Sequence, residues 1–221
     1  ECRLHCSWLY KSGRKLPAVQ TLRVDPRRFR SGIKIAGMPR LDRNSAVLLV
    51  VDVQEKLLPV IHDSARVLRN VERLVRGAHV LGVPVLVTEQ YVKGLGPTVT
   101  PLRQALEETS GYHPIEKDCF SAHGCAAFSS RLKASGRRQV LVAGVETHVC
   151  VYQSIGDLLG DGYEVTVIAD AVSSRTAENR DIALQRLVAE GAKLSSTEMA
   201  LFELTVVSGT DEFRAISRLI K

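Results

Sequence analysis

The sequence has few aromatic residues and no long uncharged apolar segment. Phe, Trp and Tyr make up 5% of the 221 residues, so few rings are available to stack single-stranded bases. Apolar segments such as residues 45–51 have the length of a strand, whereas a membrane-spanning helix needs about 20 residues. The hydrophobic fraction of 45% is nevertheless enough to build a core. The composition excludes a membrane protein and predicts a folded domain.

Acidic residues are scarce at the start of the chain. Residues 1–40 contain ten Lys or Arg and two acids, a net charge of +8, whereas residues 41–221 contain 20 basic and 22 acidic residues. The surplus of positive charge is therefore confined to one end. Because the remainder has no excess of cations to neutralise phosphates, we expect no nucleic-acid partner.

This charge distribution predicts a basic, disordered N-terminal extension over residues 1–40 and one folded domain over residues 41–221. Three interpretations of the extension stay open: a mitochondrial presequence, a disordered tail that contacts acidic partners, or residues upstream of a natural start at Met38. We expect a cytoplasmic protein, or a mitochondrial one if residues 1–37 are a genuine presequence.

Metal and nucleotide signatures are also missing. The five cysteines include no pair with zinc-site spacing and follow no secretory signal, which predicts a reducing compartment. The six histidines are isolated from one another, so we expect no metal and no cofactor. Glycine is absent from the segment after the first predicted strand, which argues against a dinucleotide-binding domain.

What the sequence does contain is an alternation of β-rich apolar segments with amphipathic ones. It predicts a doubly wound, Rossmann-like three-layer α/β/α sandwich with a six-stranded, mostly parallel sheet. A long Gly- and Pro-containing loop after the second strand indicates a binding loop or lid. The predicted strands are 46–51, 83–87, 114–117, 139–143, 163–168 and 192–195; the predicted helices are 63–81, 102–108, 125–133, 147–159, 175–191, 199–204 and 211–220.

Three polar residues follow predicted strands, where ligands bind in sheets of this kind. Asp52 ends the first strand, Lys117 ends the third, and Cys150 lies in the first turn of the helix after the fourth. If Thr147 caps that helix, its N-terminus favours the Cys150 thiolate. Each residue also has an ordinary interpretation: a turn cap for Asp52, a surface cation for Lys117, a core thiol for Cys150. Together they indicate one pocket in which a carboxylate, an ammonium and a thiol meet.

The body of the chain, from about Leu41 onward, resembles the isochorismatase-like cysteine hydrolases. The resemblance rests on Val51-Asp-Val-Gln-Glu55, Glu116-Lys-Asp-Cys-Phe-Ser121 and Gly144-Val-Glu-Thr-His-Val-Cys150. The segment from Thr88 to Thr98 is most similar to the isochorismatase domain-containing branch. Residues 88–100 contain no histidine, so this chain departs from the metal-binding nicotinamidases of the superfamily.

The resemblance implies a role for each site residue. Asp52 would be the general base, Lys117 the activating cation and Cys150 the nucleophile. A cis peptide bond between Val145 and Glu146 would orient the backbone N–H groups of Glu146 and Cys150 as an oxyanion hole. It also implies a homo-oligomer. By position at a strand end, the predicted substrate-binding residues are Glu89, Gln90 and Tyr91.

We therefore expect a metal-independent cysteine hydrolase that cleaves a small-molecule amide, carbamoyl or ester carbonyl through a thioester intermediate. The alternative is a non-catalytic interaction module that has kept the same fold.

Overall fold

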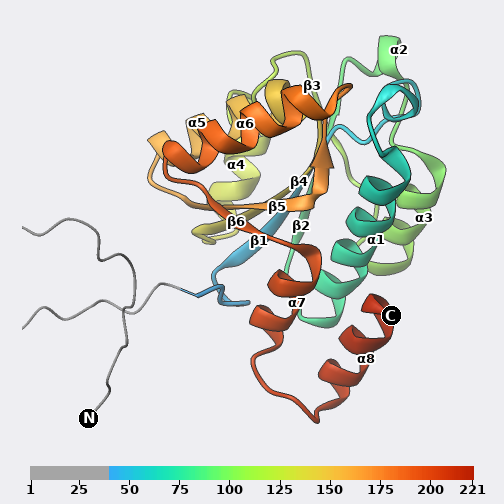
Figure 1. Cartoon of the computed structure of the whole chain (residues 1–221), viewed down its shortest axis with the longest axis vertical. Helices are drawn as coiled ribbons and strands as arrows, with labels where there is room; N and C mark the ends of the chain where they lie inside the picture. Colours follow the sequence, from blue (N-terminus) through green and yellow to red (C-terminus); the bar gives the residue numbers. More distant parts are fainter. Residues whose placement is uncertain (1–39) are drawn as a thin grey trace, which may run out of the picture. The chain divides into compact units, whose positions relative to one another are not determined.

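A six-stranded sheet organises residues 40–221, the part of the chain that the computed structural model describes. The strand order is β3-β2-β1-β4-β5-β6, and every adjacent pair is parallel (Figure 1). This confirms the predicted α/β class. The strands are β1 (Ala46–Val51), β2 (Val85–Gln90), β3 (Ile115–Lys117), β4 (Gln139–Val145), β5 (Glu164–Ser173) and β6 (Lys193–Ser195).

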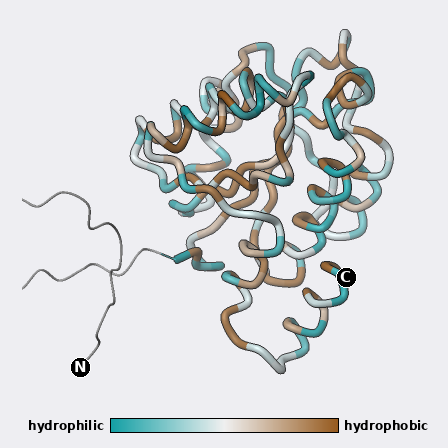
Figure 2. The backbone as a smooth tube through the Cα atoms, in the orientation of Figure 1, coloured by the Kyte–Doolittle hydropathy of each residue, from teal (hydrophilic) through white to brown (hydrophobic). Residues whose placement is uncertain are grey.

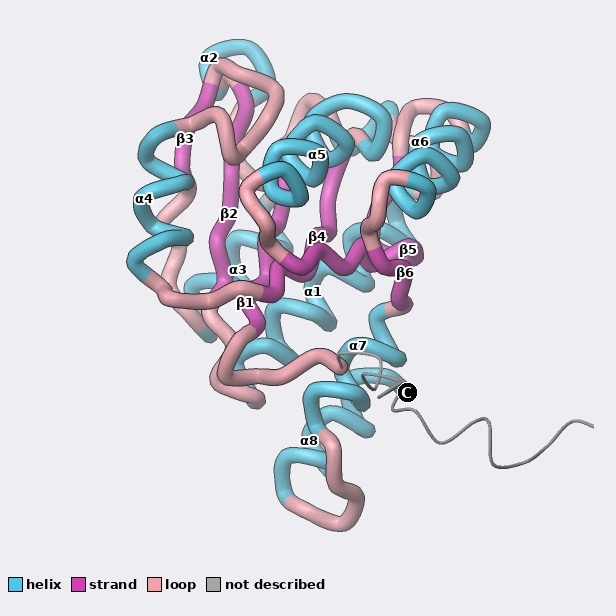
Figure 3. Tube along the Cα trace, turned by 90° about the vertical axis from the view of Figure 1, so that its left-hand side faces the viewer, coloured by secondary structure: helices cyan, strands magenta, loops and turns pink. Residues whose placement is uncertain are grey.

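Helices cover both faces of the sheet, which gives the three predicted layers (Figures 1 and 3). On one face the buried core includes residues of α1, α3, α7 and α8. On the other face it includes residues of α4, α5 and α6. The helices are α1 (Ser64–Val80), α2 (Val92–Leu95), α3 (Thr100–Thr109), α4 (Ala126–Ala134), α5 (Tyr152–Gly160), α6 (Ala177–Ala189), α7 (Thr197–Thr205) and α8 (Asp211–Ile220).

The central strand β1 contributes to both cores because its side chains alternate between the two faces of the sheet. Ala46, Leu48 and Val50 pack in one core, and the intervening Val47, Leu49 and Val51 pack in the other. All six residues are buried, and the strands are drawn largely in the hydrophobic colour in Figure 2. Burial of one such side chain stabilises the fold by about 1.5–3 kcal/mol.

The strand order reverses between β1 and β4. From β1 the chain continues outward to β2 and β3, and from β4 it continues in the opposite direction to β5 and β6. In doubly wound sheets the crevice beyond such a reversal is the usual ligand site. Asp52 directly follows β1, and the turn that contains Cys150 follows β4, so both residues lie at this crevice.

Gly144 allows β1 and β4 to approach closely at their carboxyl ends. Its φ is +112°, and a β-carbon at this position would lie 2.1 Å from the carbonyl oxygen of Val51. Any side chain would therefore push β4 away from β1. The register between β4 and β5 also shifts at Val142/Gly144, so the end of β4 departs from regular strand geometry just before the candidate site.

Most predicted helices and strands are confirmed; the structure adds the short helix α2 within the predicted loop after the second strand and shifts the ends of several elements. β2 continues to Gln90 because its last three residues pair with β3. β5 continues to Ser173, so Asp170 lies within a strand instead of after it. The carboxylate of Asp170 accepts hydrogen bonds from the backbone N–H and hydroxyl of Thr197.

The predicted extension over residues 1–40 lies, apart from Arg40, outside the described residues. Within residues 40–221, none of the helices combines the length and the apolar character that crossing a bilayer requires.

Candidate active site

Asp52 lies at the carboxyl end of β1 and is completely buried. Its φ is +51°, a left-handed conformation that is uncommon for residues other than glycine. One carboxylate oxygen accepts a 2.7 Å hydrogen bond from the hydroxyl of Thr88, and the other accepts a 2.8 Å bond from Lys117 Nζ. A buried carboxylate requires such partners, because an unpaired charge in the interior is strongly destabilising.

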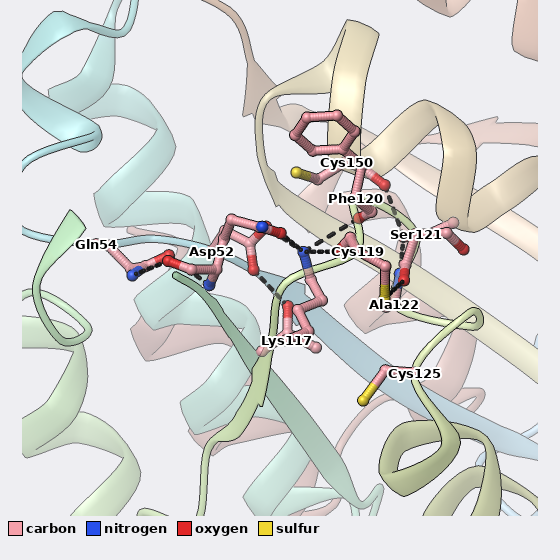
Figure 4. Close-up of polar contacts among 12 residues, drawn as sticks. Asp52, Gln54, Lys117, Cys119, Phe120, Ser121, Ala122, Cys125 and Cys150 are labelled. Atoms are coloured by element: carbon pink, nitrogen blue, oxygen red, sulfur yellow. Dashed lines mark hydrogen bonds and ion pairs between the residues drawn. The ribbon is translucent and has the colours of Figure 1, made fainter. Parts of the chain in front are cut away.

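Lys117 provides the cation of this pair and is also buried. Besides Asp52, its ammonium donates to the side-chain oxygen of Gln90 at 2.6 Å and to the backbone carbonyls of Phe120 and Cys119 at 3.1 and 3.3 Å (Figure 4). Three oxygens in addition to the carboxylate therefore hold one ammonium group, and its position is fixed from several sides.

The thiol of Cys150 lies beside this ion pair and is 5% exposed. Burial raises its pKa to about 12, and the negative charge of Asp52 acts in the same direction, while the charge of Lys117 opposes them. The expectation that the helix N-terminus favours a thiolate is therefore not met in the resting site. The thiol keeps its proton at neutral pH, next to a carboxylate that can accept it.

This raised pKa predicts the pH dependence of Cys150 alkylation. The thiolate is the reactive form, so the rate with iodoacetamide should rise roughly tenfold per pH unit between about pH 7 and 10. An unperturbed cysteine, with a pKa of about 8.5, levels off within that range. The measurement is the modification rate of the peptide that contains Cys150, resolved by mass spectrometry from the other cysteines. A plateau near pH 8.5 would contradict the burial argument.

The backbone around Cys150 differs from the predicted continuous helix. Residues Thr147–Val151 form a π-helical turn that leads directly into α5. Such turns are frequent at functional sites. Glu146, not Thr147, is the residue that precedes the turn, and the buried hydroxyl of Thr147 has no hydrogen-bond partner among residues 40–221. The peptide bond between Val145 and Glu146 is cis.

The two predicted substrate-binding residues at the end of β2 face opposite sides of the sheet. Gln90 points toward the triad of Asp52, Lys117 and Cys150. Its side chain accepts the bond from Lys117 and donates to the carbonyl of Asp118. Glu89 points the other way, and its carboxylate accepts bonds from Thr98 and from the hydroxyl of Tyr112. Glu89 therefore holds the loop after β2, and within residues 40–221 its carboxylate hydrogen-bonds Thr98 and Tyr112 and no member of the triad.

Two other predicted residues lie at the edge of the site. Tyr91 is exposed and lines a cavity of about 220 Å³ next to Lys117. The side chain of Glu146 accepts hydrogen bonds from the backbone N–H and the guanidinium of Arg175, so it orders the segment before α6. His148 bonds Ser174 through its ring nitrogen Nδ1.

Sequence reasoning missed Thr88 and Gln54. Thr88 holds Asp52, and it lies two residues before Gln90, so strand alternation places both side chains on the triad face. Gln54 is completely buried and joins two segments: its amide donates to the carbonyls of Gln90 and Gly96, and its oxygen accepts from the N–H of Gln90. The polar Thr-Glu-Gln end of β2 was the signal available in the sequence.

Replacing Thr88 by valine tests its contribution to the site. The shape is nearly kept, but one oxygen of the buried Asp52 loses its hydrogen-bond donor. A lost hydrogen bond to a charged group costs about 1.5–3 kcal/mol, which we expect to find as a lower free energy of unfolding in urea. As a matched control, Thr100→Val changes an exposed threonine at the start of α3. Equal stability of the two variants would show that the Thr88–Asp52 bond contributes little.

A cavity of about 450 Å³ lies elsewhere, between α1, α3 and α8, and none of the triad residues lines it. Its size does not outweigh the chemistry of the triad, because its lining residues include an Arg76–Glu108 ion pair but no buried nucleophile. Among residues 40–221 there is no group of three or more His, Cys, Asp or Glu side chains arranged to hold a metal ion.

The sequence matches the family model described as the isochorismatase domain over residues 46–199. Among curated proteins, it is 41% identical to the "Secreted isochorismatase effector Isc1" of Phytophthora sojae, over 82% of this chain and 87% of that protein. It is 38% identical to the "Isochorismatase domain-containing protein 2" of Danio rerio, over 84% of this chain and 92% of that protein.

Solved structures show the same fold. The MAR1 ribonuclease of Caenorhabditis elegans superposes with a TM-score of 0.76 at 34% identity, covering 82% of this chain and 92% of that one. YcaC of Pseudomonas aeruginosa, described with covalent acrylamide, has a TM-score of 0.75 at 30% identity, covering 81% and 90%. YcaC of Escherichia coli, described as an octameric hydrolase of unknown specificity, has a TM-score of 0.76 at 28% identity, covering 82% and 89%.

Proposed function

This chain belongs to the isochorismatase family, and on that basis we propose that it is a metal-independent cysteine hydrolase acting on the amide, carbamoyl or ester carbonyl of a small molecule. One observation carries the proposal: the buried Lys117–Asp52 ion pair lies beside the Cys150 thiol. A buried ion pair adds little stability on its own. Next to a thiol, it supplies both a proton acceptor and a compensating charge.

The proposed reaction begins when Cys150 Sγ attacks the carbonyl carbon and its proton passes to the Asp52 carboxylate. The carbonyl oxygen gains the negative charge, which the backbone N–H groups of Glu146 and Cys150 would stabilise. Each such donor contributes about 2.7–4 kcal/mol to lowering the barrier. Lys117 binds one oxygen of the Asp52 carboxylate at 2.8 Å and so fixes the position of the proton acceptor.

The tetrahedral intermediate then breaks its C–N or C–O bond. Protonated Asp52 donates its proton to the leaving nitrogen or oxygen, and the acyl group remains on Cys150 as a thioester. Water attacks the thioester while Asp52 accepts a proton from that water. The C–S bond breaks, and Asp52 passes its proton to the departing sulfur, which restores the resting thiol and the Asp52 carboxylate. The cycle consumes one water molecule and uses only groups of this chain.

A mass-spectrometric screen tests the proposal. The full chain is incubated with a panel of small amides, carbamates and esters, quenched in acid and mapped for an acyl adduct on Cys150. Acrylamide serves separately as a thiol probe, because a similar protein was captured with it covalently bound; it adds to sulfur through its C=C bond and releases no leaving group. A Cys150 adduct together with release of the leaving group is the expected result. A correctly folded chain that gives neither product nor adduct across the panel would favour the non-catalytic module.

RNA is included as a further substrate in the same screen, because one structural neighbour is named a ribonuclease. We expect no cleavage, since residues 41–221 contain 20 basic and 22 acidic residues and offer no cationic surplus. RNA cleavage that persists in Cys150→Ser would indicate a second activity that the triad does not perform.

The proposal includes a homo-oligomer, because a neighbour at 28% identity is described as octameric. Light scattering of the purified full chain measures its mass in solution directly. A monomer at micromolar concentration would contradict this part of the proposal.

A further inference from the structure

Two cysteines outside the triad line the cavity that Tyr91 and Lys117 also line. Cys119 is exposed and Cys125 is partly exposed, and both contribute to the walls of the cavity of about 220 Å³ next to Lys117. A side-chain carbon at Gly124, the neighbour of Cys125, would lie 3.8 Å from Cys119 Sγ. Figure 4 shows both cysteines on the loop that leads from Lys117 to α4. Both thiols therefore border one cavity that small molecules can enter.

The loop that carries these cysteines is held at several points. Ser121 donates to the carboxylate of Asp157 at 2.6 Å, and the N–H of Ala122 donates to the hydroxyl of Ser154 at 2.7 Å. Within the loop, the N–H of Cys125 donates to the carbonyl of Ala122 at 3.0 Å. These bonds keep the loop folded back on itself, so the two thiols face one cavity in the resting protein.

The same loop holds the triad lysine. The carbonyl oxygens of Cys119 and Phe120 accept hydrogen bonds from Lys117 Nζ. A covalent change at Cys119 therefore acts on a residue whose own backbone binds the ammonium. Displacement of that backbone moves an acceptor away from the cation that pairs with Asp52.

We propose that Cys119 and Cys125 form a thiol-modification site, in which a small-molecule disulfide such as oxidised glutathione converts them to an intramolecular disulfide that displaces Lys117 from its resting position. The formation of this bond does not depend on the hydrolase proposal. Only its consequence for turnover rests on that proposed function.

The reaction takes place in two exchanges. The thiolate of exposed Cys119 attacks one sulfur of oxidised glutathione, the S–S bond of glutathione breaks, and one glutathione leaves as the thiol. The thiolate of Cys125 then attacks Cys119 Sγ and releases the second glutathione. Both cysteine protons end on the two glutathione molecules. The protein is oxidised by two electrons, and glutathione disulfide is reduced by two.

Peptide mapping of the full chain tests the site. Trypsin places Cys119 and Cys125 together in peptide 118–131, which contains no other cysteine. After treatment with oxidised glutathione, this peptide should be lighter by two hydrogen atoms and should resist iodoacetamide until it is reduced. Cys125→Ser should instead retain glutathione on Cys119. A wild-type peptide that keeps glutathione on Cys119 while Cys125 is still alkylated would overturn the proposal, because the two sulfurs then cannot meet.

The consequence for Lys117 has its own readout, the rate at which acrylamide labels Cys150. Misplacement of a reacting group by about 1 Å can cost about 100-fold in rate, so oxidation should change this labelling by roughly tenfold or more. The double variant C119S/C125S should label at the same rate with and without oxidised glutathione. Unchanged labelling of the cross-linked wild type would refute the displacement of Lys117. A cross-linked peptide together with no turnover on the substrate panel would support the thiol-modification site and contradict the proposed hydrolase function.

Discussion

Replacing Cys150 by serine is expected to lower turnover of any substrate found in the screen by roughly 10⁴- to 10⁶-fold, the cost of removing a catalytic nucleophile. A serine hydroxyl is a much weaker nucleophile than a thiol, and a carboxylate such as that of Asp52 is too weak a base to activate it. The thioester would be absent from acid-quenched samples. The measurement is steady-state turnover of wild type and variant, together with intact mass.

The serine variant is a clean test because sulfur and oxygen differ little in volume and Cys150 is buried. We expect its thermal unfolding to remain near that of the wild type, so lost turnover reports lost chemistry. Turnover that stays within about tenfold of the wild type would remove Cys150 from the mechanism. Within residues 40–221, the remaining candidates would then be the more accessible thiols Cys119 and Cys125.

Replacing Lys117 by methionine is expected to lower the free energy of unfolding by about 3–5 kcal/mol, measured by urea denaturation at neutral pH. The loss arises because Asp52 would remain as a buried charge without its cation. Lys133→Met is the matched control, since Lys133 is exposed near the end of α4. Its effect should stay within about 0.5 kcal/mol.

Adding Asp52→Asn to Lys117→Met should recover most of the lost free energy of unfolding, because the uncompensated charge disappears. The double variant should have no turnover, because it lacks the proton acceptor. This separates the two roles of the pair: the neutral variant keeps the fold without its proton acceptor. A Lys117→Met variant as stable as the wild type would show that the pair is not held as a buried charge pair in solution. A double variant that turns over substrate would exclude Asp52 as the base.

The alternation of apolar strands and amphipathic helices was sufficient to predict the sheet, its class and its three layers. It also placed Asp52, Lys117 and Cys150 at one edge, since each lies at or just after the end of a strand and strand ends meet at one edge of a parallel sheet. The predictions that failed concern features set by contacts between residues far apart in the sequence. The end of β5 could not be predicted from its own residues, because Asp170 finds its partner in Thr197, far along the chain.

The protonation state of Cys150 could not be predicted from the sequence for the same reason. Position after a strand and near a helix N-terminus favours a thiolate, but burial and the charge of Asp52 act against it and prevail. The direction of the Glu89 side chain similarly depended on the register of β2. An error of one residue in that register exchanges the triad face for the opposite one, so only the structure shows that Thr88 and Gln90 face the triad while Glu89 faces away.

The ammonium of Lys117 is anchored partly by main-chain carbonyls, those of Cys119 and Phe120. A carbonyl is present whatever side chain a residue carries, so mutation at these two positions can alter the rim of the pocket without removing the anchor. Substrate preference and catalytic geometry are thereby uncoupled along a stretch of two residues. A fold built in this way can diversify among many small substrates while the same lysine continues to sit where the reaction needs it.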